Sequence, residues 1–298
     1  MNAPIESQFS GLVGAEVDPT SPPAVDRGSR RLPVTFIVGV LFLAVATIVA
    51  VLSIFWLPHA LSDTSGGRLE NPSASHWLGT DRLGRDTLSY VLVGTRIALT
   101  VGLGAAAIAV VIGLAIGLLA AHARGWLDDV GSSFLDVLIA FPTLLLAMLI
   151  GATQGASLTT AVVSIGVAAS AVVARFVRIL TKRLLGQQYI VAAQTSGTGT
   201  FSIVIRHLLP NMWTSVVVNA ALIFGAAVLT EASLSYLGLG VPPPNASLGR
   251  LMQAAQGTVL IAPWGAIAPG VVIVIIVLGA NFFADGLRDI GDPTRRKN

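Results

Sequence analysis

The 298-residue sequence lacks cysteine and has few charged residues. Without cysteine, disulfide frameworks, zinc–thiolate sites and thiol redox chemistry are excluded. Charged residues make up 11% of the chain, against roughly 25% in soluble domains. The only lysines, Lys182 and Lys297, do not follow the G-x-x-x-x-G spacing of a P-loop, so the sequence has no P-loop for a nucleotide. These absences exclude an ordinary soluble enzyme.

The sequence instead contains long apolar blocks, and hydrophobic residues make up 54% of the chain. Each block reaches the roughly 17–25 residues that a helix needs to cross the hydrocarbon core. Barrel strands alternate and are about half as long, so the blocks indicate helices. The predicted fold class is an all-α polytopic membrane protein. Its six predicted transmembrane helices are 34–57, 97–121, 134–152, 156–174, 214–237 and 266–287.

The basic residues flank the apolar blocks, which favours a role in membrane topology over nucleic-acid binding. With the N-terminus inside, thirteen basic residues fall on the cytoplasmic side and five outside. This positive-inside bias predicts that both termini and a loop at 175–213 face the cytoplasm. The outer set is Arg68, Arg82, Arg85, Arg96 and Arg250.

The same pattern divides the chain. Residues 1–33, rich in Pro, Ser and Gly, are predicted to be a disordered cytoplasmic tail. The first transmembrane helix, 34–57, leads to an extracytoplasmic segment, 58–96, which ends in an amphipathic interfacial helix capped by Asp86. The membrane core then covers 97–290, and 291–298 forms a second cytoplasmic tail. Within the core, Gly113 and Gly117 suit close helix contact.

The 175–213 loop has the residues of a helix–turn–helix. Helix formers cover 184–196, and Gly197 is a natural stop because it accepts the left-handed conformation of a C-terminal cap. Thr200 is expected to cap a second helix, 201–208, before Pro210 removes a backbone donor. The pattern fits either a docking surface for another protein or a surface hairpin without a partner.

One stretch of this loop resembles the "EAA" coupling loop of ABC-importer permeases, which docks on an ATPase subunit. It runs from Tyr189 through the small pair Ala192-Ala193 to Gly197 and on to Arg206-His-Leu-Leu-Pro210-Asn211. The family's Glu position holds Val191, and an aliphatic position three before Pro210 holds His207. The coupling residues that the resemblance implies are Val191, Ala192, Ala193, Gly197, Arg206, His207 and Pro210.

Three further stretches carry a second resemblance: 76–97, with Gly-Thr-Asp-Arg-Leu-Gly-Arg-Asp at 79–86, then 231–243 and 281–289. They resemble the C-type permeases of dipeptide/oligopeptide/nickel ABC importers (DppC/OppC-like). The four stretches lie in the family's order, and the resemblance covers about 34–294.

The resemblance implies a bacterial inner (plasma) membrane permease with the type I importer fold. A B-type permease, two ABC ATPase subunits or domains and an extracytoplasmic solute-binding protein are its implied partners, beside membrane lipid and a peptide substrate. No nucleic acid is implied. The chain itself would hold no cofactor or metal and perform no catalysis, while Mg-ATP sits on the partner subunits. Nickel or glutathione remain alternative substrates.

Four charged residues are further candidates. Asp81, Arg85 and Asp86 form a patch outside the membrane, either at the pathway entrance or subunit interface, or as local ion pairs of small energy. Glu231 lies in an apolar span, where carboxylates are costly and often functional, and is a candidate for the pathway or the subunit interface.

Two rival classes stay open. An ion-driven secondary transporter often has broken helices and charged midplane sites. The predicted midplanes are apolar apart from Asn219, and such a transporter has no use for the 175–213 loop. The other rival is a scaffold that transports nothing.

Overall fold

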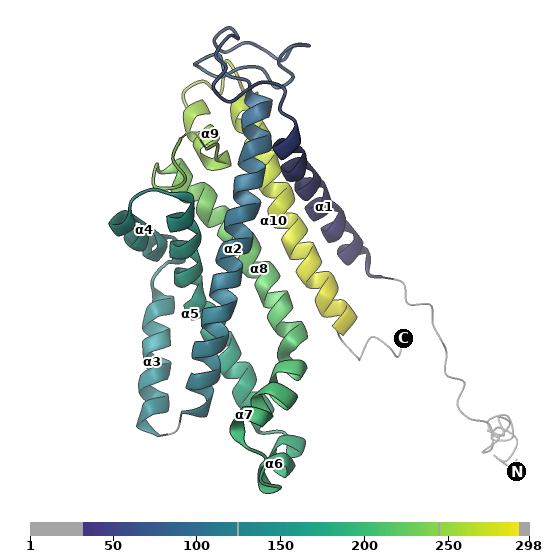
Figure 1. Cartoon of the computed structure of the whole chain (residues 1–298), viewed down its shortest axis with the longest axis vertical. Helices are drawn as coiled ribbons and strands as arrows, with labels where there is room; N and C mark the ends of the chain where they lie inside the picture. The colour runs from purple at the N-terminus through teal and green to yellow at the C-terminus, as the bar shows by residue number, and fades with distance from the viewer. Residues whose placement is uncertain (1–31, 124, 244, 292–298) are drawn as a thin grey trace, which may run out of the picture. The chain divides into compact units, whose positions relative to one another are not determined.

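The computed structural model describes residues 32–123, 125–243 and 245–291. The chain divides into Met1–Arg31 and Leu32–Asn298, and the first unit, with most of the predicted disordered tail, lies outside the described residues. So do residues 292–298 of the predicted C-terminal tail. The described part is helical, and its one β-bridge joins Thr80 to Asp86 (Figure 1).

The long helices follow the predicted apolar blocks. Within the described residues, five helices are long and apolar enough to cross a membrane, and six spans result if a bent pair counts as one. The helices are α1 (Val34–Phe55), α2 (Thr87–His122), α3 (Trp126–Ala140), α4 (Thr143–Gln154), α5 (Leu158–Leu185), α6 (Gln188–Thr195), α7 (Thr200–Ile203), the π-helix η2 (Val204–Leu208), α8 (Leu209–Tyr236), α9 (Leu248–Ala255) and α10 (Trp264–Gly291).

The third span differs from the predicted continuous helix 134–152. It is the bent pair α3 and α4, whose axes meet at 86°. The break falls at Phe141 and Pro142, both outside helical geometry. A proline disfavours the α conformation of the residue before it and lacks the donor that would continue the helix.

The predicted interfacial helix before residue 97 is not a separate element. Asp86 does cap a helix, since its side chain accepts from the Ser89 backbone N–H at 2.8 Å. That helix is α2 itself, which runs unbroken for 36 residues from Thr87. The amphipathic first turns therefore form the beginning of the second span.

Small residues let α2 lie against α5, as the Gly113 and Gly117 spacing predicts. A Cβ at Gly117 would come within 2.6 Å of the Ala174 carbonyl oxygen, and one at Gly113 within 2.5 Å of Val173 Cβ. The two backbones thus approach closely and make extensive van der Waals contact. Such packing matters in lipid, because no hydrophobic force drives helices together there.

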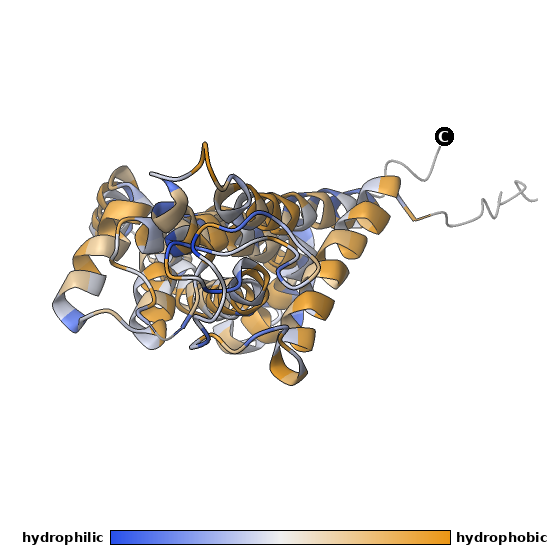
Figure 2. Cartoon of the chain, turned by 90° about the horizontal axis from the view of Figure 1, so that it is seen from above, coloured by the Kyte–Doolittle hydropathy of each residue, from blue (hydrophilic) through white to orange (hydrophobic). Residues whose placement is uncertain are grey.

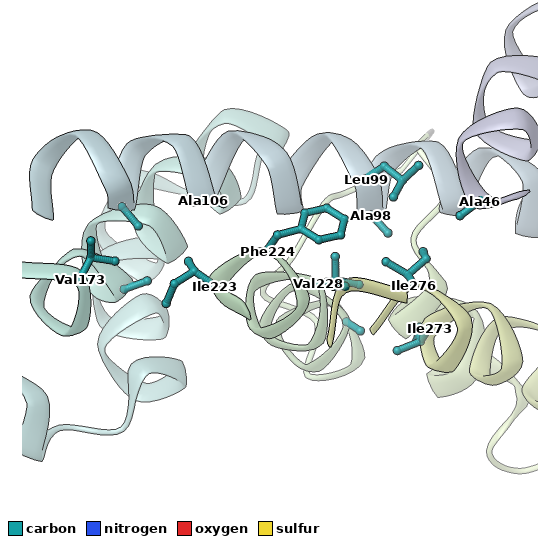
Figure 3. Close-up of a cluster of buried hydrophobic side chains, with 14 of the residues drawn as sticks. Ala46, Ala98, Leu99, Ala106, Val173, Ile223, Phe224, Val228, Ile273 and Ile276 are labelled. Carbon is teal, nitrogen blue, oxygen red and sulfur yellow. The ribbon is translucent and has the colours of Figure 1, made fainter. Parts of the chain in front are cut away.

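The main apolar core lies where α2, α5, α8 and α10 meet. Val173, Phe224, Val228 and Ile276 are buried in it (Figure 3). Large apolar residues such as Leu103, Val111 and Leu229 are exposed on the same helices. Most of the helical ribbon in Figure 2 is coloured as hydrophobic. A bundle that is apolar inside and outside is the arrangement expected in lipid.

The spans alternate in direction. In Figure 1, α1, α3 and α8 run toward the connections 56–86 and 237–263, while α2, α5 and α10 run away from them. The helices α6 and α7 project at the opposite end from those connections. This alternation agrees with the predicted order of spans.

Candidate functional site

The candidate site is the hairpin formed by α6, α7 and η2. Gly197 ends α6 with a φ of +81°, as predicted. The Gly197 N–H donates to the Gln194 carbonyl and the Thr198 N–H to the Ala193 carbonyl, each at 3.0 Å. These two bonds form a complete Schellman motif. No atom lies within 4 Å of a Cβ built at Gly197, so backbone shape rather than clearance requires glycine there.

The predicted helix 184–196 is broken at its start. The spanning helix α5 continues to Leu185, and a turn at Gly186 and Gln187 separates it from α6. Most of the predicted 175–213 loop is therefore helical. Its first part belongs to α5, which ends at Leu185, and its last part belongs to the helix that begins at Thr200.

A small core holds the hairpin together. Ile190 of α6, Ile203 of α7 and Leu208 of η2 are fully or almost fully buried against one another, with Leu184 and Leu185 packed at the edge. Ile190 is the one buried residue of α6. One face of α6 thus fixes the hairpin to the bundle, and the remaining face is open.

The open face exposes apolar side chains beside the polar Gln188, Gln194 and Thr195. Val191 and Ala192 are exposed on α6, and Phe201 of α7 has 80% of its surface exposed. Ala193 is half-buried. Aromatic side chains are enriched at surfaces that bind another protein. We call Val191, Ala192 and Phe201 the hairpin face.

The second predicted helix does not stop before Pro210. Thr200 to Tyr236 form one helix of 37 residues. Thr200 is its first residue and Gly199 its N-cap, so the expected Thr200 cap is wrong. In the π-helical turn η2, the Leu209 N–H donates to the Val204 carbonyl, five residues back. This wider turn sits directly before Pro210, where a regular helix would meet the proline ring and a missing donor.

Two further predicted coupling residues lie in η2. Arg206 is exposed, while His207 is half-buried with its ring centroid 6.4 Å from that of Tyr189. Asn211, in the first turn of α8, donates from Nδ2 to the Tyr189 hydroxyl at 3.1 Å and to the His207 carbonyl at 2.8 Å. These contacts tie α6 to the long helix.

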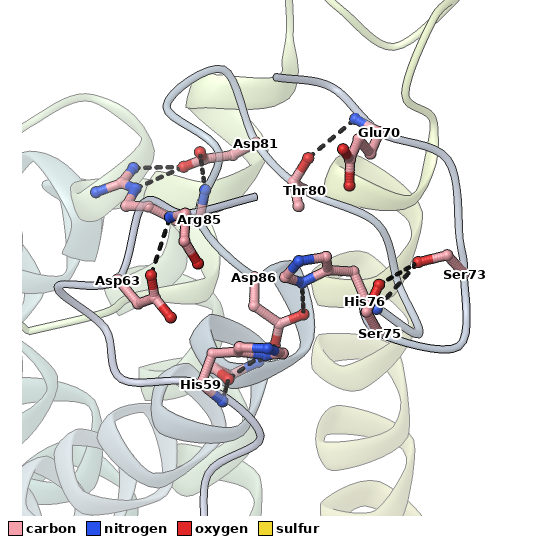
Figure 4. A network of polar contacts seen from close by, with 12 residues as sticks. His59, Asp63, Glu70, Ser73, Ser75, His76, Thr80, Asp81, Arg85 and Asp86 are labelled. Carbon is pink, nitrogen blue, oxygen red and sulfur yellow. Dashed lines mark hydrogen bonds and ion pairs between the residues drawn. The ribbon is translucent and has the colours of Figure 1, made fainter. Parts of the chain in front are cut away.

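At the other end of the molecule, Asp81 and Arg85 form a local ion pair. The Arg85 Nη2 lies 2.6 Å from Asp81 Oδ2 (Figure 4). The Arg85 Nη1 donates to the Tyr90 hydroxyl at 3.0 Å. Burial opposes the charge of Arg85, but hydrogen bonds and charge attraction from Asp81 and Tyr90 outweigh it and raise its pKa. This geometry matches the interpretation as local ion pairs, and Asp86 turns inward as the cap of α2.

Glu231 is enclosed within this chain, with none of its surface exposed. Its Oε1 accepts from Ser235 Oγ at 2.7 Å and from Ser247 Oγ at 2.9 Å. Ser247 precedes α9, so the carboxyl group joins α8 to the segment that leads into α9. The side chain does not reach the surface of this chain. A place on the pathway or at a subunit interface stays a prediction.

Sequence reasoning missed Phe201 and Ser247, and it placed Asn211 in the resembling stretch without counting it among the coupling residues. An aromatic residue in an otherwise polar loop is a usable signal for Phe201. No local pattern identifies Ser247, which lies 16 residues after Glu231 and meets it only through folding.

Apolar spans that alternate in direction, with a small hairpin projecting at one end, define a polytopic α-helical membrane protein. A family model described as "Binding-protein-dependent transport system inner membrane component" matches residues 109–297, and the chain belongs to this family. It is a permease subunit of an ABC importer, which works with other permease and ATPase components.

Curated relatives extend the likeness to nearly the whole chain. The dipeptide transport system permease protein DppC of Alkalihalophilus pseudofirmus is 34% identical over 93% of this chain and 95% of its own length. The glutathione transport system permease protein GsiD of Pectobacterium atrosepticum is 41% identical over 75% of this chain and 74% of its own. Among solved structures, the inward-facing MetNI methionine ABC transporter matches 66% of this chain and 94% of that chain, with a TM-score of 0.57 and 21% identity, and supports the fold.

Proposed function

We propose that this chain forms half of the translocation pathway of an importer for di- or oligopeptides. Its partners are a B-type permease, two ATPase subunits and an extracytoplasmic binding protein. The near full-length likeness to a dipeptide permease supports a peptide substrate. Glutathione is the second candidate, because a glutathione permease shares the higher identity over a shorter stretch.

The observation that carries the coupling proposal is the single helix from the hairpin to the far end of the molecule. Thr200–Tyr236 spans 37 residues, roughly 55 Å at 1.5 Å per residue. Phe201 lies at one end and Glu231, joined to Ser247, near the other. A push on the hairpin face by an ATPase subunit therefore reaches the opposite end through one rigid element. ATP binding and hydrolysis take place on the partners, and this chain is non-catalytic.

Docking is tested on the hairpin face. Phe201→Ala and Ala192→Glu should each reduce copurification of the ATPase subunits with the assembled importer at least several-fold. Both side chains are exposed, so neither change should lower the amount of this chain in the membrane. The control is Leu260→Ala in the α9–α10 connection, where the side chain is 97% exposed at the opposite end. Unchanged copurification with both hairpin variants would refute docking here.

Substrate class is tested with the complete importer in proteoliposomes. Labelled dipeptide, longer peptide and glutathione are offered with the binding protein and internal ATP. Dipeptide or oligopeptide uptake above the ATP-free level supports the peptide assignment. Uptake of glutathione alone selects the second candidate, and uptake of none of them contradicts both.

A further inference from the structure

Three side chains that can bind a metal meet in the segment between α1 and α2. His59 follows the end of α1, His76 lies in the middle of the segment and Asp86 caps α2. One donor atom from each lies within 4.8 Å of the other two. The two imidazole rings face each other at 4.5 Å between centroids, beside the carboxylate (Figure 4). The chain has no cysteine and four histidines, and half of those histidines are here.

The distances leave one ring nitrogen unused. His76 Nδ1 is hydrogen-bonded to Asp86 Oδ1 at 3.2 Å. His59 Nδ1 lies 4.0 Å from Asp86 Oδ2, which is too long for a hydrogen bond. That nitrogen is buried without a hydrogen-bond partner among the described residues. A buried polar atom in this state is uncommon and costs free energy unless another group satisfies it.

The spacing suits a small divalent ion. Ligands about 2.1 Å from a tetrahedral Zn²⁺ lie about 3.4 Å from one another. His76 Nδ1 lies 3.2 Å from Asp86 Oδ1, and His59 Nδ1 lies 4.0 Å from the other carboxylate oxygen, Oδ2. One donor atom from each residue lies within 4.8 Å of the other two, so the three donors must draw together to hold one ion. Two imidazole nitrogens with one carboxylate oxygen form a ligand set used by zinc and by neighbouring transition metals.

A second layer of hydrogen bonds holds the donors in place. Asp86 Oδ2 accepts from the backbone N–H of Ser89 at 2.8 Å and from its hydroxyl at 2.7 Å. The same hydroxyl accepts from the His59 backbone N–H at 3.1 Å. Ser89 therefore fixes the carboxylate and the His59 backbone together, as outer-shell groups do around metal ligands.

We propose that His59, His76 and Asp86 bind Zn²⁺ or a similar divalent transition metal. The ion replaces the proton between His76 and Asp86 and satisfies the unused nitrogen of His59. It clamps the end of α1 to the start of α2 outside the membrane spans. With three protein ligands, a fourth position remains for water or a donor from another chain.

The test uses the full-length chain, purified in detergent with a histidine-free affinity tag and stripped with a chelator. Zn²⁺ is titrated by calorimetry, and Co²⁺ absorption reports the coordination geometry. One Zn²⁺ should bind per chain and raise the thermal unfolding temperature. His59→Phe keeps an aromatic ring against His76 but removes the donor. It should weaken Zn²⁺ binding at least tenfold and abolish the zinc-dependent rise in unfolding temperature.

The matched control is His122→Phe, because His122 lies at the other end of α2 with Nδ1 bonded to the Leu118 carbonyl. It should bind Zn²⁺ as the unchanged chain does. Since the His59 side chain makes no hydrogen bond to a described residue, the metal-free His59→Phe chain should unfold near the unchanged temperature. Absence of stoichiometric Zn²⁺ binding would overturn the proposal. So would equal Zn²⁺ affinity in the His59→Phe chain, or loss of binding in the control.

Discussion

The Asn211 amide donates a hydrogen bond to the Tyr189 hydroxyl at 3.1 Å and thereby joins the first turn of α8 to α6. The two residues are 22 positions apart, Tyr189 in α6 and Asn211 in α8. This contact lies between the hairpin face and the long helix that we propose carries the push of an ATPase subunit.

Removing this bond should loosen α6. A hydrogen bond contributes about 0.5–1.5 kcal/mol net, so Tyr189→Phe or Asn211→Ala should speed amide exchange in α6 about 2- to 10-fold. The exchange of α6 amides is followed by mass spectrometry, with α3 amides as the internal control. Tyr189→Phe removes only this bond, whereas Asn211→Ala also removes the bond to the His207 carbonyl. The double variant should therefore match Asn211→Ala. Full additivity would mean that the two residues act separately.

Position 197 should tolerate few residues other than glycine. A residue with a Cβ held at positive φ costs about 1–2 kcal/mol, so Gly197→Ala should fray the end of α6 and lower substrate-stimulated ATP hydrolysis by the importer. Gly197→Asn should retain more activity, because Asn accepts this conformation better. The matched control is Gly186→Ala, where φ is −80° and an added Cβ makes only an ordinary contact. Equal losses at both positions would contradict the cap argument.

Glu231 should act through hydrogen bonds to its two serine partners. Glu231→Gln keeps an acceptor oxygen. The free energy of unfolding of this variant should stay within about 1 kcal/mol of that of the unchanged chain. Glu231→Leu leaves Ser235 and Ser247 without their acceptor and should lose about 1–3 kcal/mol. Thermal unfolding in detergent measures both.

Two serine variants serve as controls for the Glu231 prediction. Ser247→Ala should reproduce part of the loss of unfolding free energy expected for Glu231→Leu. Ser233→Ala should not, because the Ser233 hydroxyl bonds to the Leu229 carbonyl of its own helix. If Gln proves as damaging as Leu, the carboxylate charge matters and this account is wrong.

The proposed orientation is tested with single cysteines, since the native chain has none. Ser65 lies in the α1–α2 connection and Ser196 at the end of α6, and both are exposed. A membrane-impermeant thiol reagent added to intact cells should label Ser65→Cys and spare Ser196→Cys. Both should react after the cells are opened. Labelling of position 196 alone from outside would reverse the orientation and remove the docking argument.

Features governed by local chemistry could be predicted from the sequence. Apolar blocks long enough to cross the bilayer became the spanning helices, because lipid leaves a backbone few other ways to satisfy its hydrogen bonds. The Asp86 cap and the Gly197 stop were also predictable, since each depends on one side chain or on one backbone conformation.

Other features were decided only by the tertiary structure. Pro142 and Pro210 look alike in sequence, yet the first ends α3 and the second lies within a continuous helix, where the π-turn before it provides room. The hydrogen bond of Glu231 to Ser247 and the meeting of His59, His76 and Asp86 join residues from different segments. No periodicity encodes such contacts, because they depend on where packing brings separate segments together.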